Sequence, residues 1–204
     1  MAYNMWDKEP EKLKFDKMTE KEKTLLTENK SFCMLPWMHL HAFPDGRAYP
    51  CCFAQDKYPV GDLNKNSMAE VFNNDKMKKL RKNMLNGITN KECVKCYDQE
   101  KSGFFSLRYS SNKHFGHNIG LTDATKSDGS VDFVIKYWDI RFSNLCNFAC
   151  RSCGTWFSSN WYEDHIKVTG SPPNHAKIMR VGRTANDIWE QMLEQFDHVE
   201  QFYF

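Results

Sequence analysis

Hydrophobic positions divide the 204-residue chain into a polar start, a first block of short elements, a polar interval and a second block. Residues 1–30 are dominated by Lys, Glu, Asp and Thr with only a loose helical stripe, which predicts a partly ordered arm. Residues 113–130 are rich in Asn, Ser, Gly, Asp and Thr, which predicts a linker. We therefore expect two folded parts, over 31–112 and 131–204.

The first folded part begins with two apolar runs, 38–43 and 48–53, on either side of a Pro-Asp-Gly-Arg turn signal. This pattern predicts a β-hairpin. Residues 67–70 then fit a capping box, so a short helix is expected to start there. Apolar residues at helical spacing predict a second helix over 75–86, and a further helix is expected to run from Cys93 toward Tyr109.

The second folded part opens with 131–142, a nearly continuous apolar and β-branched run that indicates a buried parallel strand. Helices are expected near 158–167 and over 185–196, and a last strand over 199–204. Strand, helical crossover and strand make a β/α unit, whereas a closed barrel needs about eight strands. The predicted fold class is therefore α/β, with an α+β first part followed by the first units of an incomplete (β/α) barrel.

Composition and charge indicate the class of protein and the compartment in which it is expected. Hydrophobic residues make up 41% of the chain and aromatic residues 14%, which is typical of a globular protein. A formal net charge of +2 argues against a nucleic-acid partner, and no apolar run approaches the roughly 20 residues of a membrane helix. The start lacks the apolar core of a signal peptide, so we expect a cytoplasmic protein. Thiols stay reduced there, and eight cysteines then indicate metal or cluster ligands.

Three of the cysteines, Cys146, Cys150 and Cys153, lie on one short loop directly after the strand predicted over 131–142. Three thiolates can hold a four-iron four-sulfur cluster with one iron left open, since such clusters normally take four. Zinc sites usually show C-x-x-C pairs, and the step from Cys146 to Cys150 does not fit that habit. The spacing therefore favours a cluster over zinc.

The sequence around this loop, Ser-Asn-Leu-Cys-Asn-Phe-Ala-Cys-Arg-Ser-Cys-Gly, resembles the radical S-adenosylmethionine (SAM) superfamily. The resemblance implies a cluster loop after the first barrel strand, with SAM bound at the open iron. It also implies reductive cleavage of SAM to a 5′-deoxyadenosyl radical that abstracts hydrogen from a peptide or small-molecule substrate, with flavodoxin or ferredoxin as electron donor. In that family the second strand runs into a Gly-Gly-Glu-Pro segment. We therefore expect an enzyme if the chain continues past residue 204, and an inactive fragment otherwise.

A second resemblance lies in the first folded part. Cys33, twelve residues, Gly46, four residues and Cys51, followed later by Cys93-x-x-Cys96, is similar to the SPASM or twitch auxiliary-cluster modules of radical SAM enzymes. The resemblance implies one auxiliary four-iron cluster, as in twitch modules, with these ligands: Cys33, Cys51, Cys93 and Cys96. Cys52 is then the spare cysteine, because its side chain is expected on the other strand face. A four-cysteine zinc knuckle is the alternative for this set.

Other features admit a plainer interpretation. The whole chain is alternatively a non-catalytic zinc- or cluster-binding interaction module. His39, His41, Asp139 and Arg141 are expected to be half-buried strand residues in preference to substrate groups. The basic residues of the helix over 75–86 are expected to form a solvated face in preference to phosphate contacts.

Overall fold

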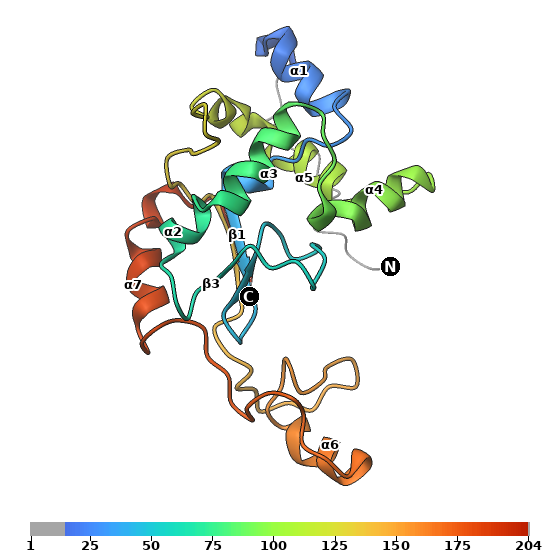
Figure 1. The fold of residues 1–204 in the computed structure, drawn as a ribbon, viewed down its shortest axis with the longest axis vertical. Coiled ribbons are helices and arrows are strands. Elements are labelled where there is room, and N and C mark those ends of the chain that lie inside the picture. Colours follow the sequence, from blue (N-terminus) through green and yellow to red (C-terminus); the bar gives the residue numbers. More distant parts are fainter. Residues whose placement is uncertain (1–14, 204) are drawn as a thin grey trace.

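The computed structural model describes residues 15–203 of the chain (Figure 1). Residues 1–14 of the arm predicted over 1–30 lie outside the described residues. From there the chain forms a 3₁₀ helix η1 (Phe15–Lys17) and helix α1 (Glu20–Thr27). Thr19 caps α1 in a reciprocal box with Glu22, which satisfies two backbone N–H groups at the helix start.

One open five-stranded mixed sheet organises the fold, with strand order β3-β2-β1-β4-β5. The strands are β1 (His39–Ala42), β2 (Arg47–Tyr49), β3 (Gly61–Asp62), β4 (Tyr137–Ile140) and β5 (Gln201–Tyr203). β1, β2 and β3 are antiparallel neighbours, whereas β1, β4 and β5 run parallel. The predicted α/β class is confirmed, and the described residues form no barrel.

The two predicted parts share this sheet. β1 belongs to the first part and β4 to the second, and the two strands pair over their whole length from His39↔Tyr137 to Ala42↔Ile140. A segment far along the chain therefore completes the sheet that the hairpin begins. Figure 1 shows α2 (Met68–Phe72) and α7 (Asp187–Leu193) on one side of β1, and α4 (Val94–Lys101) on the other.

Four of the described α-helices, α1, α2, α3 (Asp75–Leu85) and α5 (Leu107–Phe115), begin at a residue whose side chain caps the first turn. Ser67 and Glu70 form the predicted capping box of α2, and Asn74 caps α3. α3 ends before Gly87, which adopts a φ of 70° that other residues avoid. The remaining helices are α6 (Trp161–Thr169) and the short 3₁₀ segments η2 (Leu35–Trp37), η3 (Lys91–Cys93), η4 (Gly116–Thr122) and η5 (Phe196–His198).

Four predicted elements differ from the structure. The second strand of the hairpin, expected over 48–53, ends at Tyr49, so Cys51 and Cys52 lie after it. The helix expected from Cys93 toward Tyr109 is interrupted, because Gly103 takes a positive φ and Ser106 caps a new helix, α5. The linker expected over 113–130 instead contains the end of α5 and η4, and its Phe115 and Ile119 belong to the buried core. The strand expected over 131–142 pairs only at 137–140.

Arg81 on α3 also differs from its predicted role in a solvated basic face. Its side chain is fully buried, and its guanidinium donates hydrogen bonds to the carbonyls of Pro36 at 2.8 Å and Phe72 at 2.7 Å. The guanidinium also lies over the Phe72 ring. Arg81 therefore ties α3 to the end of α2 and to η2, while the lysines of α3 remain on the surface.

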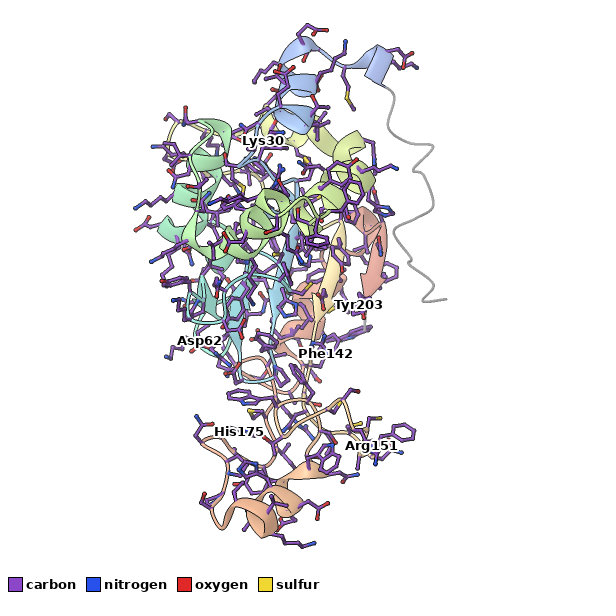
Figure 2. The ribbon with its side chains drawn as sticks, turned by 90° about the vertical axis from the view of Figure 1, so that its right-hand side faces the viewer. Lys30, Asp62, Phe142, Arg151, His175 and Tyr203 are labelled. Atoms are coloured by element: carbon purple, nitrogen blue, oxygen red, sulfur yellow. The ribbon has the colours of Figure 1, made fainter. Side chains whose placement is uncertain are left out.

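The segment between β4 and β5 carries a lobe at one end of the sheet. Figure 2 shows Phe142 where the sheet meets this lobe, and Arg151 and His175 within it. Asn144, fully buried, holds the lobe together: its amide nitrogen donates to the carbonyls of Thr155 and Lys177, both at 3.0 Å. Its amide oxygen accepts from the Met179 N–H at 2.8 Å.

Candidate functional site: two sets of cysteines

The four cysteines assigned to the first set come from four different places in the fold. Cys33 lies just before η2, Cys51 follows β2, Cys93 ends η3 and Cys96 lies in the first turn of α4. Cys33 and Cys96 are buried, and the other two are half-buried. The structure brings the four thiols into one electrostatic neighbourhood, because Cys51 interacts with each of the other three.

Their surroundings oppose the charged form of each thiol. Burial raises the pKa of Cys33 to about 12, and it raises the pKa values of Cys51, Cys93 and Cys96 as well. Neighbouring thiolates also raise the pKa values of Cys33, Cys51 and Cys93. For Cys96, burial and the nearby Glu100 carboxylate are the causes that raise the pKa. Four thiolates in such a place need a positive centre, which bound iron supplies. The donor set fits an iron–sulfur cluster in this respect.

Hydrogen-bond donors and one buried cation face these sulfurs. The N–H of Leu35 points to Cys33, and the Tyr97 hydroxyl points to Cys93. Arg108, only 7% exposed, lies close enough to stabilise negative charge on both Cys33 and Cys96. Such donors and charges adjust the potential of a bound cluster.

Arg108 is held firmly in that position. Its guanidinium forms an ion pair with Glu100 and donates to the carbonyl of Phe32 at 2.8 Å and of Asn29 at 3.1 Å. No sequence pattern singled out Arg108. The sequence offers one weak signal for Arg108, which is its place twelve residues after Cys96 in a helix. That place is not distinctive by itself.

Cys52 has a different neighbour. Its thiol hydrogen-bonds to the Asp139 carboxylate on β4, and burial followed by that carboxylate raises its pKa to about 12. Cys52 is exposed as a whole residue, in contrast to the four cysteines of the first set, although its thiol reaches the buried Asp139 carboxylate. Its assignment as the spare cysteine stays a prediction, to which this separate contact is relevant.

A polar row lies on one face of the sheet beside Cys52. His39 and His41 on β1 stand opposite Tyr137 and Asp139 on β4, and all four are buried. His39, His41 and Asp139 lie in strands as expected, but they are fully buried where half-buried positions were expected. His41 Nδ1 lies 3.0 Å from Asp139 Oδ2. Burial opposes charge on Asp139, but the His41 imidazole 3.0 Å away holds the net pKa of Asp139 below its usual value.

His39 is fixed in one tautomer. Its Nδ1 lies 2.9 Å from the carbonyl oxygen of Tyr137, which can only accept, so Nδ1 carries the proton. The imidazole also stacks on the Tyr137 ring at a centroid distance of 4.4 Å. Burial lowers the pKa of His39 to about 4, so the ring is neutral at pH 7.

The second set of cysteines lies on the loop that follows β4. Cys146 and Cys153 are half-buried and Cys150 is exposed. The Cys153 N–H donates to the Cys150 carbonyl at 3.0 Å, which closes a tight turn between them. Trp161 Nε1 donates to the same carbonyl at 3.1 Å and ties the loop to α6. The Phe148 N–H donates to the Cys146 sulfur at 3.4 Å.

A pocket of about 340 Å³ opens beside this loop. Cys153 lines one side, and Trp161, Asp164, His165 and Val168 of α6 line the other. The pocket therefore offers an apolar wall and two titratable side chains next to a thiol. The structure does not bring this loop together with Cys33, Cys51, Cys93 or Cys96 in any described interaction.

Cation–π and ring contacts join the loop to the hairpin of the first part. The Arg47 guanidinium lies 4.9 Å from the Trp156 ring centroid, and that of Arg141 lies 4.9 Å from the Phe157 ring centroid. Phe43 at the end of β1 packs on Phe157, with ring centroids 5.8 Å apart. The segment directly after the cysteine loop thus contacts the hairpin through Phe43 and Arg47.

Residues 33–97 match the family model of the SPASM iron–sulfur cluster-binding domain. The chain therefore contains a SPASM domain, a module found in radical SAM enzymes, and all four predicted ligands of the first set lie inside it. No radical SAM domain is detected in the chain. No curated protein and no solved structure matches it.

Two further findings concern the described residues. Among residues 15–203, no group of three or more His, Cys, Asp or Glu side chains is arranged to hold a metal ion. A single zinc ion would need every thiolate ligand at about 2.3 Å. Within the same part of the chain, none of the helices is both long and apolar enough to span a membrane.

Proposed function

We propose that this chain is part of a radical SAM enzyme that carries two four-iron four-sulfur clusters. The SPASM domain holds an auxiliary cluster and the loop after β4 holds the SAM-binding cluster. The auxiliary ligands are Cys33, Cys51, Cys93 and Cys96, and the loop ligands are Cys146, Cys150 and Cys153. The presence of a SPASM domain supports this proposal because such domains accompany radical SAM chemistry.

The observation that carries the proposal is the place of the three-cysteine loop. The loop follows the carboxyl end of β4, and β4 pairs in parallel with β5 after a crossover that contains α6 and α7. Ligands of parallel α/β folds bind at this edge of the sheet. A loop with three thiols at that edge suits a cluster with one iron left for a small molecule.

The residues around the loop have distinct proposed roles. Cys146, Cys150 and Cys153 bind three irons, and Asn144 fixes the loop through its three backbone hydrogen bonds. The pocket that Cys153 lines is the proposed place for part of SAM. When bound, this cluster supplies the electron that cleaves SAM to methionine and a 5′-deoxyadenosyl radical, which abstracts hydrogen from a peptide or small-molecule substrate.

An exposed apolar patch is consistent with further β/α units beside β5. Its members lie on α7, η5 and β5 and are between 37% and 57% exposed: Trp189, Leu193, Phe196, Phe202 and Tyr203. Large exposed apolar patches usually mark a contact surface. In the proposed enzyme, additional strands and helices pair with β5 and cover the patch.

Metal analysis and spectroscopy test the proposal. The full chain is reconstituted with iron and sulfide without oxygen, and two clusters predict about eight iron atoms per chain. Replacing the three loop cysteines with Ala, and separately the four SPASM cysteines, should each remove about four. SAM should change the paramagnetic resonance spectrum of the reduced wild type and of the SPASM variant, but not of the loop variant.

The outcomes separate the proposal from its alternative. Iron content that does not fall in the loop variant means that the loop holds no cluster, and the radical SAM assignment is then wrong. Zinc in place of iron and sulfide in the purified protein supports a non-catalytic interaction module.

A further inference from the structure

A second pocket, of about 490 Å³, opens on the surface of the SPASM domain. Lysines dominate its rim, and Glu92 is the one acidic residue that lines it. The four lysines are all exposed: Lys57, Lys76, Lys79 and Lys91. Because the net charge of the whole chain is only +2, this is a local concentration of positive charge.

Contacts inside the protein hold three of these ammonium groups around the opening. Lys91 Nζ lies 4.4 Å from the Tyr58 ring centroid, and Lys57 Nζ lies 5.1 Å from the same centroid. Lys76 Nζ donates to the Pro59 carbonyl at 2.8 Å. Two cations on one ring repel each other, so an anion in the pocket is favoured.

The pocket lysines also differ from their neighbours in lacking carboxylate partners. Among the described residues, no Asp or Glu oxygen lies within 4.0 Å of the four ammonium groups. Nearby, Lys95 pairs with Asp56 at 3.1 Å and Lys78 pairs with Asp128 at 2.8 Å. The positive charge of the pocket is therefore available to a partner.

The pocket lies directly against the backbone that carries a cluster ligand. Asn90, Lys91 and Glu92 line it, and Cys93 follows them at once. The Gln55 N–H donates to the Glu92 carbonyl at 2.9 Å, which joins this backbone to the segment after Cys51. An acidic protein seated on the pocket would approach within a few residues of two of the four predicted ligands.

We propose that the lysine pocket docks an acidic electron-transfer protein of the flavodoxin or ferredoxin class. This inference rests on the proposed function, because it needs a cluster in the SPASM domain. One electron passes from the reduced donor to the auxiliary cluster, so the donor is oxidised and the cluster reduced by one electron. Exposed lysines around the rim suit a transient, salt-sensitive complex better than tight recognition of one anion.

The test measures how fast reduced flavodoxin reduces the reconstituted full chain in anaerobic stopped-flow experiments. The pocket variant carries Lys76→Gln, Lys79→Gln and Lys91→Gln. The control variant loses the same charge on other surfaces: Lys65→Gln, Lys101→Gln and Lys126→Gln. Electrostatic steering raises association rates by roughly 10- to 1000-fold, so we expect at least a tenfold slower second-order reaction for the pocket variant at low salt.

The control variant should change the rate much less, and the difference between variants should shrink as salt screens the charges. Dithionite should reduce all three proteins at equal rates, since it needs no docking surface. An equal loss in both variants, or no loss in the pocket variant, would overturn the inference while leaving the proposed clusters intact.

Two other results would also decide whether the lysine pocket docks an electron-transfer protein. A Glu-rich peptide whose binding disappears in the pocket variant, with an unchanged flavodoxin rate, would make the pocket a peptide site and overturn the inference. A chain without a dithionite-reducible cluster would refute the proposed function, and the docking inference with it.

Discussion

Replacing His39 should remove a specific part of the pH dependence of stability. His39 is neutral in the fold because burial disfavours its charged form; its Nδ1 proton is donated to the Tyr137 carbonyl and its Nε2 is buried. A second proton would have to go on Nε2, which has no hydrogen-bond partner among the described residues. Burial accordingly lowers the pKa of His39 from 6.5 to about 4.

The sign of the pH dependence follows from which state of the chain, opened or folded, binds the proton at the higher pH. Between pH 6.5 and about 4 the opened chain binds a proton at His39 that the folded chain does not, so stability falls with falling pH. Above pH 6.5 the contribution is fully present. Between pH 7.5 and 5.5 this predicts a loss of about 1.4 kcal/mol, or roughly tenfold in the opening equilibrium.

Amide hydrogen exchange in β1 and β4 measures this loss on the folded, cluster-loaded protein. Wild type and His39→Gln are compared at the same pH values, so that the intrinsic pH dependence of exchange cancels. Protection of the wild type relative to the variant should fall about tenfold between pH 7.5 and 5.5. His198→Gln, at an exposed position, controls for the loss of an imidazole. Parallel pH profiles of wild type and His39→Gln would refute the argument.

Three further predictions concern single side chains. Arg81→Met leaves the Pro36 and Phe72 carbonyls without their buried donor and should cost roughly 2–6 kcal/mol in chemical denaturation, against less than about 0.5 for exposed Lys82→Met. Asn144→Ala should speed limited proteolysis within the lobe while leaving exchange of β1 unchanged; equal protection of the lobe would contradict its anchoring role. Cys51→Ser should lower iron content by about four atoms per chain and Cys52→Ser should not, and a loss in the second variant would show that the ligand assignment is wrong.

Local signals in the sequence were reliable where a few adjacent residues decide the structure. The hairpin turn, the Ser67–Glu70 capping box and the extent of α3 all follow from neighbouring side chains, and the structure confirms them. The SPASM ligand pattern likewise depends on spacing, and residues 33–97 match that domain. The loop cysteines, Cys146, Cys150 and Cys153, stay a prediction.

Long-range packing accounts for the misses. Arg81 has the sequence context of a solvated lysine-rich face, and only the approach of η2 and the end of α2 buries it. The polar composition of 113–130 concealed η4, whose Ile119 packs in the core. His41 and Asp139 meet only because β1 pairs with β4, a contact between strands almost 100 residues apart. Such a pairing has no signal within either segment.

The pairing of β1 with β4 also bears on how the two cysteine sets are related. Four residue pairs join the strands, and the buried His41–Asp139 pair crosses the same junction, so no flexible linker separates the SPASM domain from the strand before the cysteine loop. Moving one set relative to the other would require breaking buried backbone hydrogen bonds or the contacts of Arg47 with Trp156 and of Phe43 with Phe157. If both sets hold clusters as proposed, the sheet therefore fixes their separation, and electron entry at the lysine pocket would reach a centre at a constant distance from the SAM site.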